Sequence, residues 1–275
     1  MTLLAVPNVS EGRDHRAIDE IAVAFDARLL DVHRDPDHHR SVFTLAGAPG
    51  DLAGAVVGGA REVIRRLDIN HHQGVHPRVG TLDVAPIVYL EETDRGAACA
   101  EALVLADMLG DQLELPVFLY GILARGRSRA ELRRGGPTAL AQRMAAGELR
   151  PDFGPDALHA TAGAVLVAAR PPLVAFNVEL AAPASLEDAR AIAARIREGG
   201  ADGLPGVRAI GLWLEQRGVA QVSTNVEDHR ATPLAAVVQA IADCARPERA
   251  ELVGLAPRAV FEGFPADLPL SGNRL

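Results

Sequence analysis

The stretch Thr81-Leu82-Asp83-Val84-Ala85-Pro86-Ile87-Val88-Tyr89-Leu90 has the composition of a buried strand, and it decides how the first half of the chain is organised. Ahead of it, Asp51 is placed to cap a helix whose apolar residues recur with helical spacing through Leu67. Earlier still, strands are predicted over 3–9, 29–33 and 41–46, with a helix over 16–25. The resulting order β-α-β-β-α-β indicates helices layered on a sheet.

The second half of the chain repeats this outline. Between the two blocks we expect a helix over 94–113, a strand over 116–120 and an Arg-rich, solvated helix and loop over 125–150. The second block comprises a strand over 173–180, a helix opened by the capping-box-like Ser185 to Asp188, a hairpin of 207–215 and 218–226, a helix from Thr232-Pro233 to Cys244, and a strand over 251–255. We therefore predict an α+β protein of two ferredoxin-like β-α-β-β-α-β subdomains, 1–172 and 173–275, the N-terminal one enlarged. Ligands often bind in a cleft between such units.

Composition narrows the class of protein. The chain has 275 residues, 48% of them hydrophobic and 23% charged, which is enough to bury a sizeable core. A formal net charge of -8 and only 4% aromatic residues disfavour nucleic-acid binding, because neither a positive field nor a base-stacking surface is available. All 28 basic residues are Arg, so a Schiff-base lysine and a P-loop lysine are both excluded. Small-molecule substrates are the expectation.

The compartment is predicted from cysteines and apolar runs. Cys99 and Cys244 fit neither a CxxC metal site nor a disulfide framework, which favours a reducing compartment. The N-terminal residues lack the basic and apolar regions of a signal peptide, and no apolar run reaches the roughly 18 residues of a membrane span. We expect a cytoplasmic protein that does not bind membranes.

Residues 70–80, with the sequence NHHQGVHPRVG, form the first candidate for a site. A glycine and a proline oppose a regular helix here, and imidazole is the side chain whose ordinary pKa lies near neutrality. Acid-base chemistry is the favoured interpretation, with His76 as its residue, since Pro77 fixes the adjacent backbone and Arg78 can reach an anionic ligand. A metal pair of His72 and His76 and a loop with incidental histidines are the alternatives.

Other polar segments also interrupt the predicted elements. They are 7–13 (PNVSEGR), 35–40 (DPDHHR), 151–155 (PDFGP) followed by 161–163 (TAG), and the arginines between 125 and 134. Each has an ordinary structural explanation as a turn, a hairpin tip, a shaped loop or a solvated face. The loop at 151–163 would offer backbone donors to a flat ligand, and the arginines could attract a polyanionic substrate tail.

Taken in order, these segments resemble the formimidoyltransferase family. The matching stretches are VPNVSEGR (6–13), LLD (29–31), 70–84 around HPRVG, PDFGP (151–155), VAFN (174–177), QVSTN (221–225) and ELVGL (251–255), so the resemblance runs from residue 6 to about 257. No single stretch is specific to this family, but the occurrence of all of them in the same order is. Members with two functions carry a cyclodeaminase domain as well, and this chain is expected to hold the transferase part alone.

The resemblance implies transfer of a formimino group from N-formimidoyl-L-glutamate to N5 of tetrahydrofolate, a step of histidine degradation, by a homodimer whose two subdomains flank a substrate channel. It implies His76 as the catalytic acid-base residue, taking a proton from N5 and returning it to the departing glutamate nitrogen. It also implies a folate loop of Gly154, Pro155, Asp156, Ala157, Leu158, His159, Ala160, Thr161, Ala162 and Gly163, with no metal. Asn8, Arg40 and Arg78 are the candidates for holding the substrate, the arginines by pairing with its carboxylates.

The chain departs from the family pattern at five positions. Val75 stands where an acid usually precedes the catalytic His, and Gln73 where a basic residue is common. His39 replaces an Asn, Ala162 an aromatic residue of the folate loop, and Glu179 a polar amide. These departures leave open a different donor, such as formimidoylglycine, and a folate-binding paralogue without turnover.

Overall fold

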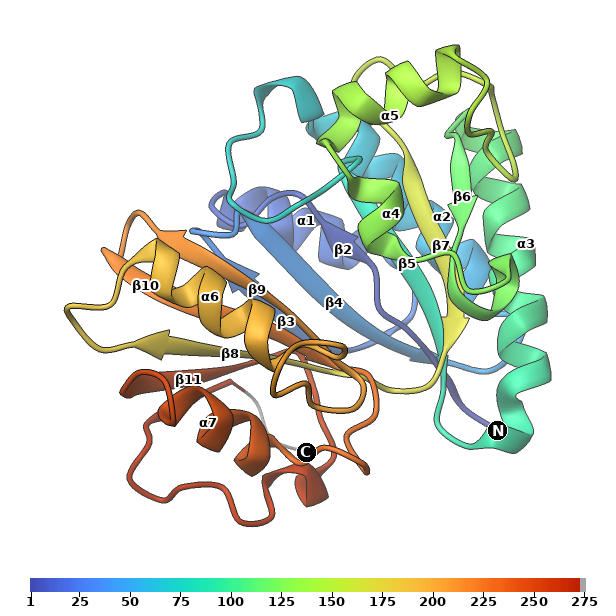
Figure 1. Ribbon diagram of the computed structural model, residues 1–275. Helices are drawn as coiled ribbons and strands as arrows, with labels where there is room; N and C mark the ends of the chain where they lie inside the picture. The colour runs from blue at the N-terminus through green and yellow to red at the C-terminus, as the bar shows by residue number, and fades with distance from the viewer. Residues whose placement is uncertain (273–275) are drawn as a thin grey trace. The chain divides into compact units, whose positions relative to one another are not determined.

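Residues 1–272 are described by the computed structural model, which divides at the Pro171-Pro172 bond into two units (Figure 1). Each unit builds its own sheet and its own hydrophobic core, so the predicted α+β class is confirmed. Among the described residues, no helix has both the length and the apolar composition that crossing a membrane requires.

The first unit contains one mixed sheet. Its strands are β1 Leu3–Ala5, β2 Asn8–Val9, β3 Arg28–Asp35, β4 Arg40–Gly47, β5 Leu82–Tyr89, β6 Val117–Leu119 and β7 Val165–Arg170. The order is β1-β4-β2-β5-β7-β6, with β3 beside β4. β7 pairs parallel to both β5 and β6, and the other pairs are antiparallel. Every residue of β5 is buried, as its apolar composition predicts.

Two sequence-based expectations for this sheet were wrong. The single strand expected over 3–9 is broken into β1 and β2, since Pro7 has no N–H to donate to a ladder. Strand β7 was not expected at all, although its apolar run is fully inside the sheet. The missed strand matters for the site, because it follows directly on the 154–163 segment.

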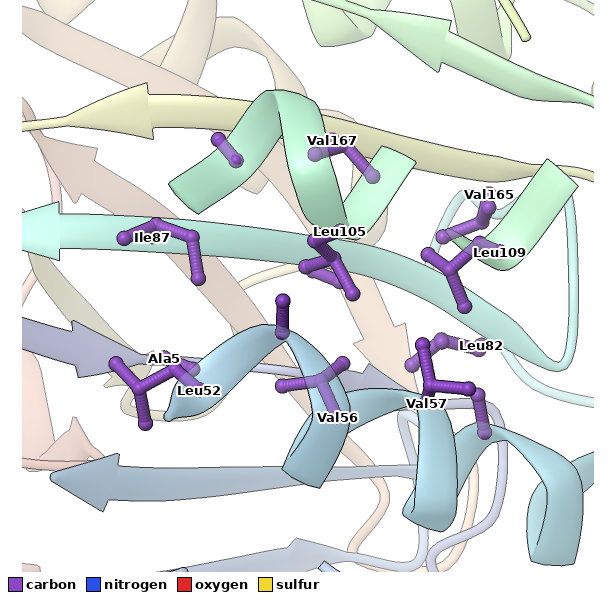
Figure 2. Packing of buried hydrophobic residues seen from close by; sticks show 14 of the residues in the cluster. Ala5, Leu52, Val56, Val57, Leu82, Ile87, Leu105, Leu109, Val165 and Val167 are labelled. Carbon is purple, nitrogen blue, oxygen red and sulfur yellow. The ribbon is translucent and has the colours of Figure 1, made fainter. Parts of the chain in front are cut away.

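The helices of this unit cover both faces of the sheet. They are α1 His15–Ala24, α2 Leu52–Arg66, α3 Arg95–Leu113, α4 Arg129–Arg133 and α5 Gly136–Ala145, with 3-10 turns at Ile69–His71, Glu92–Asp94 and Gly121–Ala124. Figure 2 shows residues of α2 and α3 against the strands: Leu52, Val56, Val57, Leu105, Leu109, Ala5, Leu82, Ile87, Val165 and Val167. The start of α2 is held by the buried Glu101, which accepts from the Ala53 N–H at 2.7 Å, while Asp51 makes no side-chain cap.

The Arg-rich stretch is not simply a solvated segment. Helices α4 and α5 bury one face on a second cluster of the same unit, through Leu132, Leu140 and Met144. That cluster includes Val84 of β5 and Leu166 of β7. The packing of α4 brings an arginine of this stretch to the interior, where the site lies.

The second unit follows the element order β-α-β-β-α-β. Its elements are β8 Val174–Leu180, α6 Leu186–Ile196, β9 Val207–Leu214, β10 Val219–Val226, α7 Leu234–Ala242 and β11 Pro247–Val253, then a 3-10 turn at Arg258–Phe261 and β12 Leu270–Ser271. The strand order is β12-β11-β8-β10-β9, antiparallel except for the β11-β12 pair. The capping box of Ser185 and Asp188 is present. Pro233, and not Thr232, occupies the N-cap of α7.

Candidate active site

The histidine loop between Ile69–His71 and β5 is held together by Arg78. Its Nη1 donates to the carbonyl of Gly74 at 3.0 Å and its Nη2 to the carbonyl of His72 at 2.8 Å. Nη1 also lies 3.4 Å from the His76 carbonyl. These bonds replace the regular hydrogen bonds that the loop lacks. The guanidinium predicted to bind substrate therefore has both terminal nitrogens committed to its own loop.

His76 is oriented by its neighbour in sequence. Its Nδ1 lies 2.8 Å from the carbonyl oxygen of Pro77, so this nitrogen carries the hydrogen and Nε2 presents the lone pair. His76 is half-buried. Burial lowers the pKa of His76 well below its ordinary value, and the charges of Arg40 and Arg133 lower it further. His76 is thus a neutral imidazole with Nε2 available as a base.

A buried ion cluster supplies those charges. Asp83 of β5 is fully buried, and its Oδ2 accepts from Arg40 Nη1 at 2.8 Å and from Arg133 Nη2. Its Oδ1 accepts from the Val79 N–H at 2.8 Å. Burial by itself would raise the pKa of Asp83, but Arg133 and Arg40 outweigh it, and the pKa ends below its usual range. Two guanidiniums against one carboxylate leave a net positive charge beside His76.

Arg40 is held from a second direction by Asn8. The Arg40 Nε donates to Asn8 Oδ1 at 3.1 Å, and Asn8 Nδ2 donates to the Val6 carbonyl at 2.7 Å. Burial lowers the pKa of Arg40 to about 10, which leaves it charged at neutral pH. The structure therefore brings together Asn8, Arg40 and His76, three residues selected from the sequence, with Asn8 contacting the guanidinium.

The predicted folate loop lies directly against the histidine loop. The Ile69 N–H donates to the Thr161 carbonyl at 2.8 Å, and the Thr81 N–H donates to the Ala162 carbonyl at 2.9 Å. Gly80 permits this approach, because a Cβ there would lie 2.0 Å from the Ala164 carbonyl oxygen. Gly163 adopts φ +73°, a left-handed conformation that favours glycine.

The tip of this loop is fixed by His159. Its Nδ1 accepts from the N–H groups of Thr161 and Ala162 at 3.3 and 3.1 Å, and its backbone pairs with that of Gly163. By contrast, residues 154–157 are exposed. A loop whose residues 159–163 are held by hydrogen bonds and whose residues 154–157 are exposed is suited to contact a ligand.

His39 and His72 form a separate stacked pair. Their ring centroids are 4.4 Å apart and nearly parallel, and His72 Nε2 lies 2.8 Å from the His39 carbonyl. Burial lowers the pKa of His72 to about 4. Among the residues that the structure describes, His72 and His76 do not share a convergent group of three metal-ligating side chains. His72 and His76, whose spacing suggested a metal pair, lie in different surroundings: His72 stacks on His39, and His76 lies beside Arg40 and Arg133.

The arginines between 125 and 134 divide among several environments. Arg127 pairs with Asp152 and donates to the Leu119 carbonyl, and Arg129 lies 5.7 Å from the centre of the Tyr120 ring. Arg133 enters the site, while Arg125 and Arg134 are exposed. The sequence pointed to Arg133 only as one of five clustered arginines, and it did not point to Asp83. A carboxylate inside the otherwise apolar β5 was the signal that could have revealed the cluster.

The site combines a neutral imidazole, two buried guanidiniums and a loop with exposed backbone in an α+β protein. Such a combination is suited to acid-base chemistry on a small anionic ligand. Residues 2–170 match the description "Formiminotransferase domain, N-terminal subdomain", and residues 175–262 match "Formiminotransferase domain". The chain belongs to the formiminotransferase family, a family of one-carbon transferases.

Similar proteins carry names in agreement with this family. A glutamate formimidoyltransferase of Thermoplasma acidophilum is 33% identical over 92% of this chain and 87% of its own. One of Streptococcus pyogenes serotype M1 is also 33% identical, over 92% and 88%. A formimidoyltransferase-cyclodeaminase of Sus scrofa is 38% identical over 85% of this chain and 45% of its own length. The chain thus spans about half the length of the relatives named for two functions.

Proposed function

We propose that this protein transfers the formimidoyl group of N-formimidoyl-L-glutamate to N5 of tetrahydrofolate, with His76 as the residue that moves the proton. Residues 1–172 and 173–275 are its two formiminotransferase subdomains. The observation that carries the proposal is the state of His76, whose Nδ1 is bonded to the Pro77 carbonyl while Nε2 is left as the proton acceptor. Two relatives named glutamate formimidoyltransferase support the choice of donor.

The chemistry needs one proton to be moved. When N5 attacks the formimidoyl carbon, a C–N bond forms and N5 bears a surplus proton in the tetrahedral intermediate. His76 takes this proton and delivers it to the glutamate nitrogen as the bond from that nitrogen to the carbon breaks. A lowered pKa suits this cycle, because the imidazole starts neutral and releases the proton readily.

The charge of the cluster supports an anionic donor. Arg40 and Arg133 share the single carboxylate of Asp83, and Arg133 Nε has no hydrogen-bond partner among the described residues. A substrate carboxylate would complete the charge balance. The exposed stretch of 154–163 is proposed to contact folate, and Asn8 to support the substrate through Arg40. The same proposal includes tetrahydrofolate as the co-substrate and no catalytic metal. It also includes a homodimer, and light scattering after size-exclusion chromatography measures this oligomeric state.

The test is an assay of the purified protein with tetrahydrofolate and formimidoylglutamate, run beside formimidoylglycine. His76→Gln should reduce kcat by about 10²- to 10⁴-fold, the range typical of lost acid-base catalysis, without a change in the midpoint of unfolding. His71→Gln is the matched control, because that side chain is 86% exposed in the same loop.

Four results would change the assignment. If the protein turns over formimidoylglycine and not formimidoylglutamate, the proposed donor is wrong. If His76→Gln keeps the turnover of the wild type, His76 is not the acid-base residue. A rise in melting temperature with tetrahydrofolate but no transfer from either donor would identify a folate-binding paralogue. Stabilisation by zinc in place of folate would instead favour a metal-dependent reaction.

A further inference from the structure

A second imidazole lies against His76 and has no part in the step described above. His38 follows β3, in the turn that leads to β4, and only 5% of its surface is exposed. Its ring centroid is 6.0 Å from that of His76, and the two rings meet edge to face. The pair comes from segments that are remote in sequence, so tertiary packing creates it.

His38 is held by a buried carboxylate. Asp35, which is 4% exposed, accepts at Oδ1 from the backbone N–H groups of Asp37 and His38 at 2.8 and 2.9 Å. Its Oδ2 bonds the Nδ1 of the His38 ring. The carboxylate therefore fixes the tautomer with hydrogen on Nδ1 and a lone pair on Nε2. In hydrolase triads, the same carboxylate-imidazole contact orients the ring and stabilises the imidazolium.

The other nitrogen of His38 is left unsatisfied. Its Nε2 is buried, and within residues 1–272 it has no hydrogen-bond partner. Buried polar atoms usually have partners, because leaving one without any carries a free-energy cost. Here the protein maintains a buried lone pair, backed by a carboxylate, beside the proposed base.

The charges around the two rings differ in sign. Arg40 and Arg133 approach His76 with positive charge, and Asp83 is already paired with both. Asp35 approaches His38 with negative charge. Positively charged groups therefore face His76, and a carboxylate faces His38.

We infer that His38, oriented by Asp35, is a positioning residue that acts through His76 as the second proton carrier of the site. The inference rests on the proposed function. N5 loses its surplus proton to His76 Nε2, and His38 Nε2 receives it from His76, directly after a ring rotation or across one water molecule. The proton returns by the same route to the departing glutamate nitrogen. Since one proton leaves N5 and one reaches glutamate, no outside acid or base is consumed.

Asp35→Asn isolates the role of the carboxylate. The amide oxygen can accept the same two backbone N–H groups, whereas the amide nitrogen donates to His38 Nδ1 and forces the hydrogen onto Nε2. We expect kcat to fall about 10²-fold, with KM within about twofold and the unfolding midpoint unchanged. His38→Gln should give a similar loss, and adding it to His76→Gln should cause no further loss, since residues acting as a unit are not additive.

A readout without substrate accompanies the kinetics. Long-range proton-nitrogen NMR spectra should find hydrogen on Nδ1 of His38 in the wild type and on Nε2 in Asp35→Asn. Arg40, Arg133 and His38 all lower the pKa of His76, so the titration of His76 should shift to higher pH in His38→Gln. His71→Gln should leave both kcat and this titration unchanged.

The outcomes separate the inference from the proposed function. Wild-type kcat in Asp35→Asn, with the tautomer reversed, would overturn the inference and leave the transferase assignment intact. Absence of transfer by the wild type would overturn the assignment. In that case the titration of His76 tests whether His38 and His76 are coupled. An unchanged titration curve in His38→Gln would reject this coupling, and a shifted curve would support it.

Discussion

Arg40 and Asp83 form a buried ion pair across neighbouring segments of one unit, with Nη1 and Oδ2 2.8 Å apart and Asp83 fully buried. Arg133 of α4 joins the same oxygen from the other side. The carboxylate thus connects strands β4 and β5 to a helix, and it sets the charge next to His76. Replacing it tests packing and electrostatics together.

Asp83→Asn should destabilise the protein by about 3–5 kcal/mol, because two buried guanidiniums would lose their counter-charge. Urea unfolding at pH 7 measures the difference from the wild type. Glu92→Gln, which removes an exposed partner of Arg95, should leave the midpoint unchanged. A loss no larger than that of the control would mean that Asp83 does not stabilise the cluster.

The same variant has a pH signature. The pKa of Asp83 is lowered in the folded state, so its contribution is fully present above the unfolded value of about 3.9 and is lost as pH falls through the folded pKa. The stability gap between Asp83→Asn and the wild type should therefore be constant from pH 7 to pH 5 and narrow only in strong acid. A gap that closes already near pH 6 would indicate another titrating group.

Because folding lowers the pKa of His72, we expect the protein to lose stability in mild acid. Its pKa falls to about 4 on folding, so the unfolded chain binds a proton first as pH drops below about 6.5, and stability declines from there to about pH 4. His72→Gln should flatten this part of the curve of unfolding free energy against pH. His71→Gln serves as control, and equal slopes in the two variants would refute the assignment to His72.

Gly80 tests the contact between the histidine loop and the 154–163 loop. In Gly80→Ala, the new Cβ would meet the carbonyl oxygens of Ala164 and Ala162 at 2.0 and 2.7 Å, and backbone cannot move aside cheaply. We expect a loss of about 1–3 kcal/mol and weaker binding of tetrahydrofolate. Gly54→Ala in α2 has open space and should stabilise by about 0.5–1 kcal/mol. Scanning calorimetry measures the two changes in stability, and titration calorimetry measures the binding of tetrahydrofolate.

Val75 is the half-buried residue directly before His76. A carboxylate there would favour the imidazolium, so Val75→Glu should raise the pKa of His76 and move the acidic limb of kcat/KM to higher pH, against the opposing charges of Arg40 and Arg133. Val75→Gln supplies the same length without charge. If the acidic limb is the same in all three proteins, position 75 does not tune His76.

Local patterns were sufficient for most elements of the fold. The apolar run of β5, the capping box at Ser185 and the hairpin of β9 and β10 were all visible in the sequence, because each depends on residues close together in the chain. The break between β1 and β2 was missed although Pro7 signals it, and β7 was missed because a short apolar run has no distinctive period.

For the site, the sequence by itself determined the composition of the histidine loop and made His76, next to Pro77, the candidate base. Tertiary structure alone decided which groups surround that imidazole. Arg40 and Arg133 are 43 and 50 residues from the Asp83 that gathers them, and Asp35 and His38 reach His76 from another turn. The proton affinity of an imidazole depends on burial and on charges brought close in space, and neither quantity is encoded in the spacing of residues along the chain.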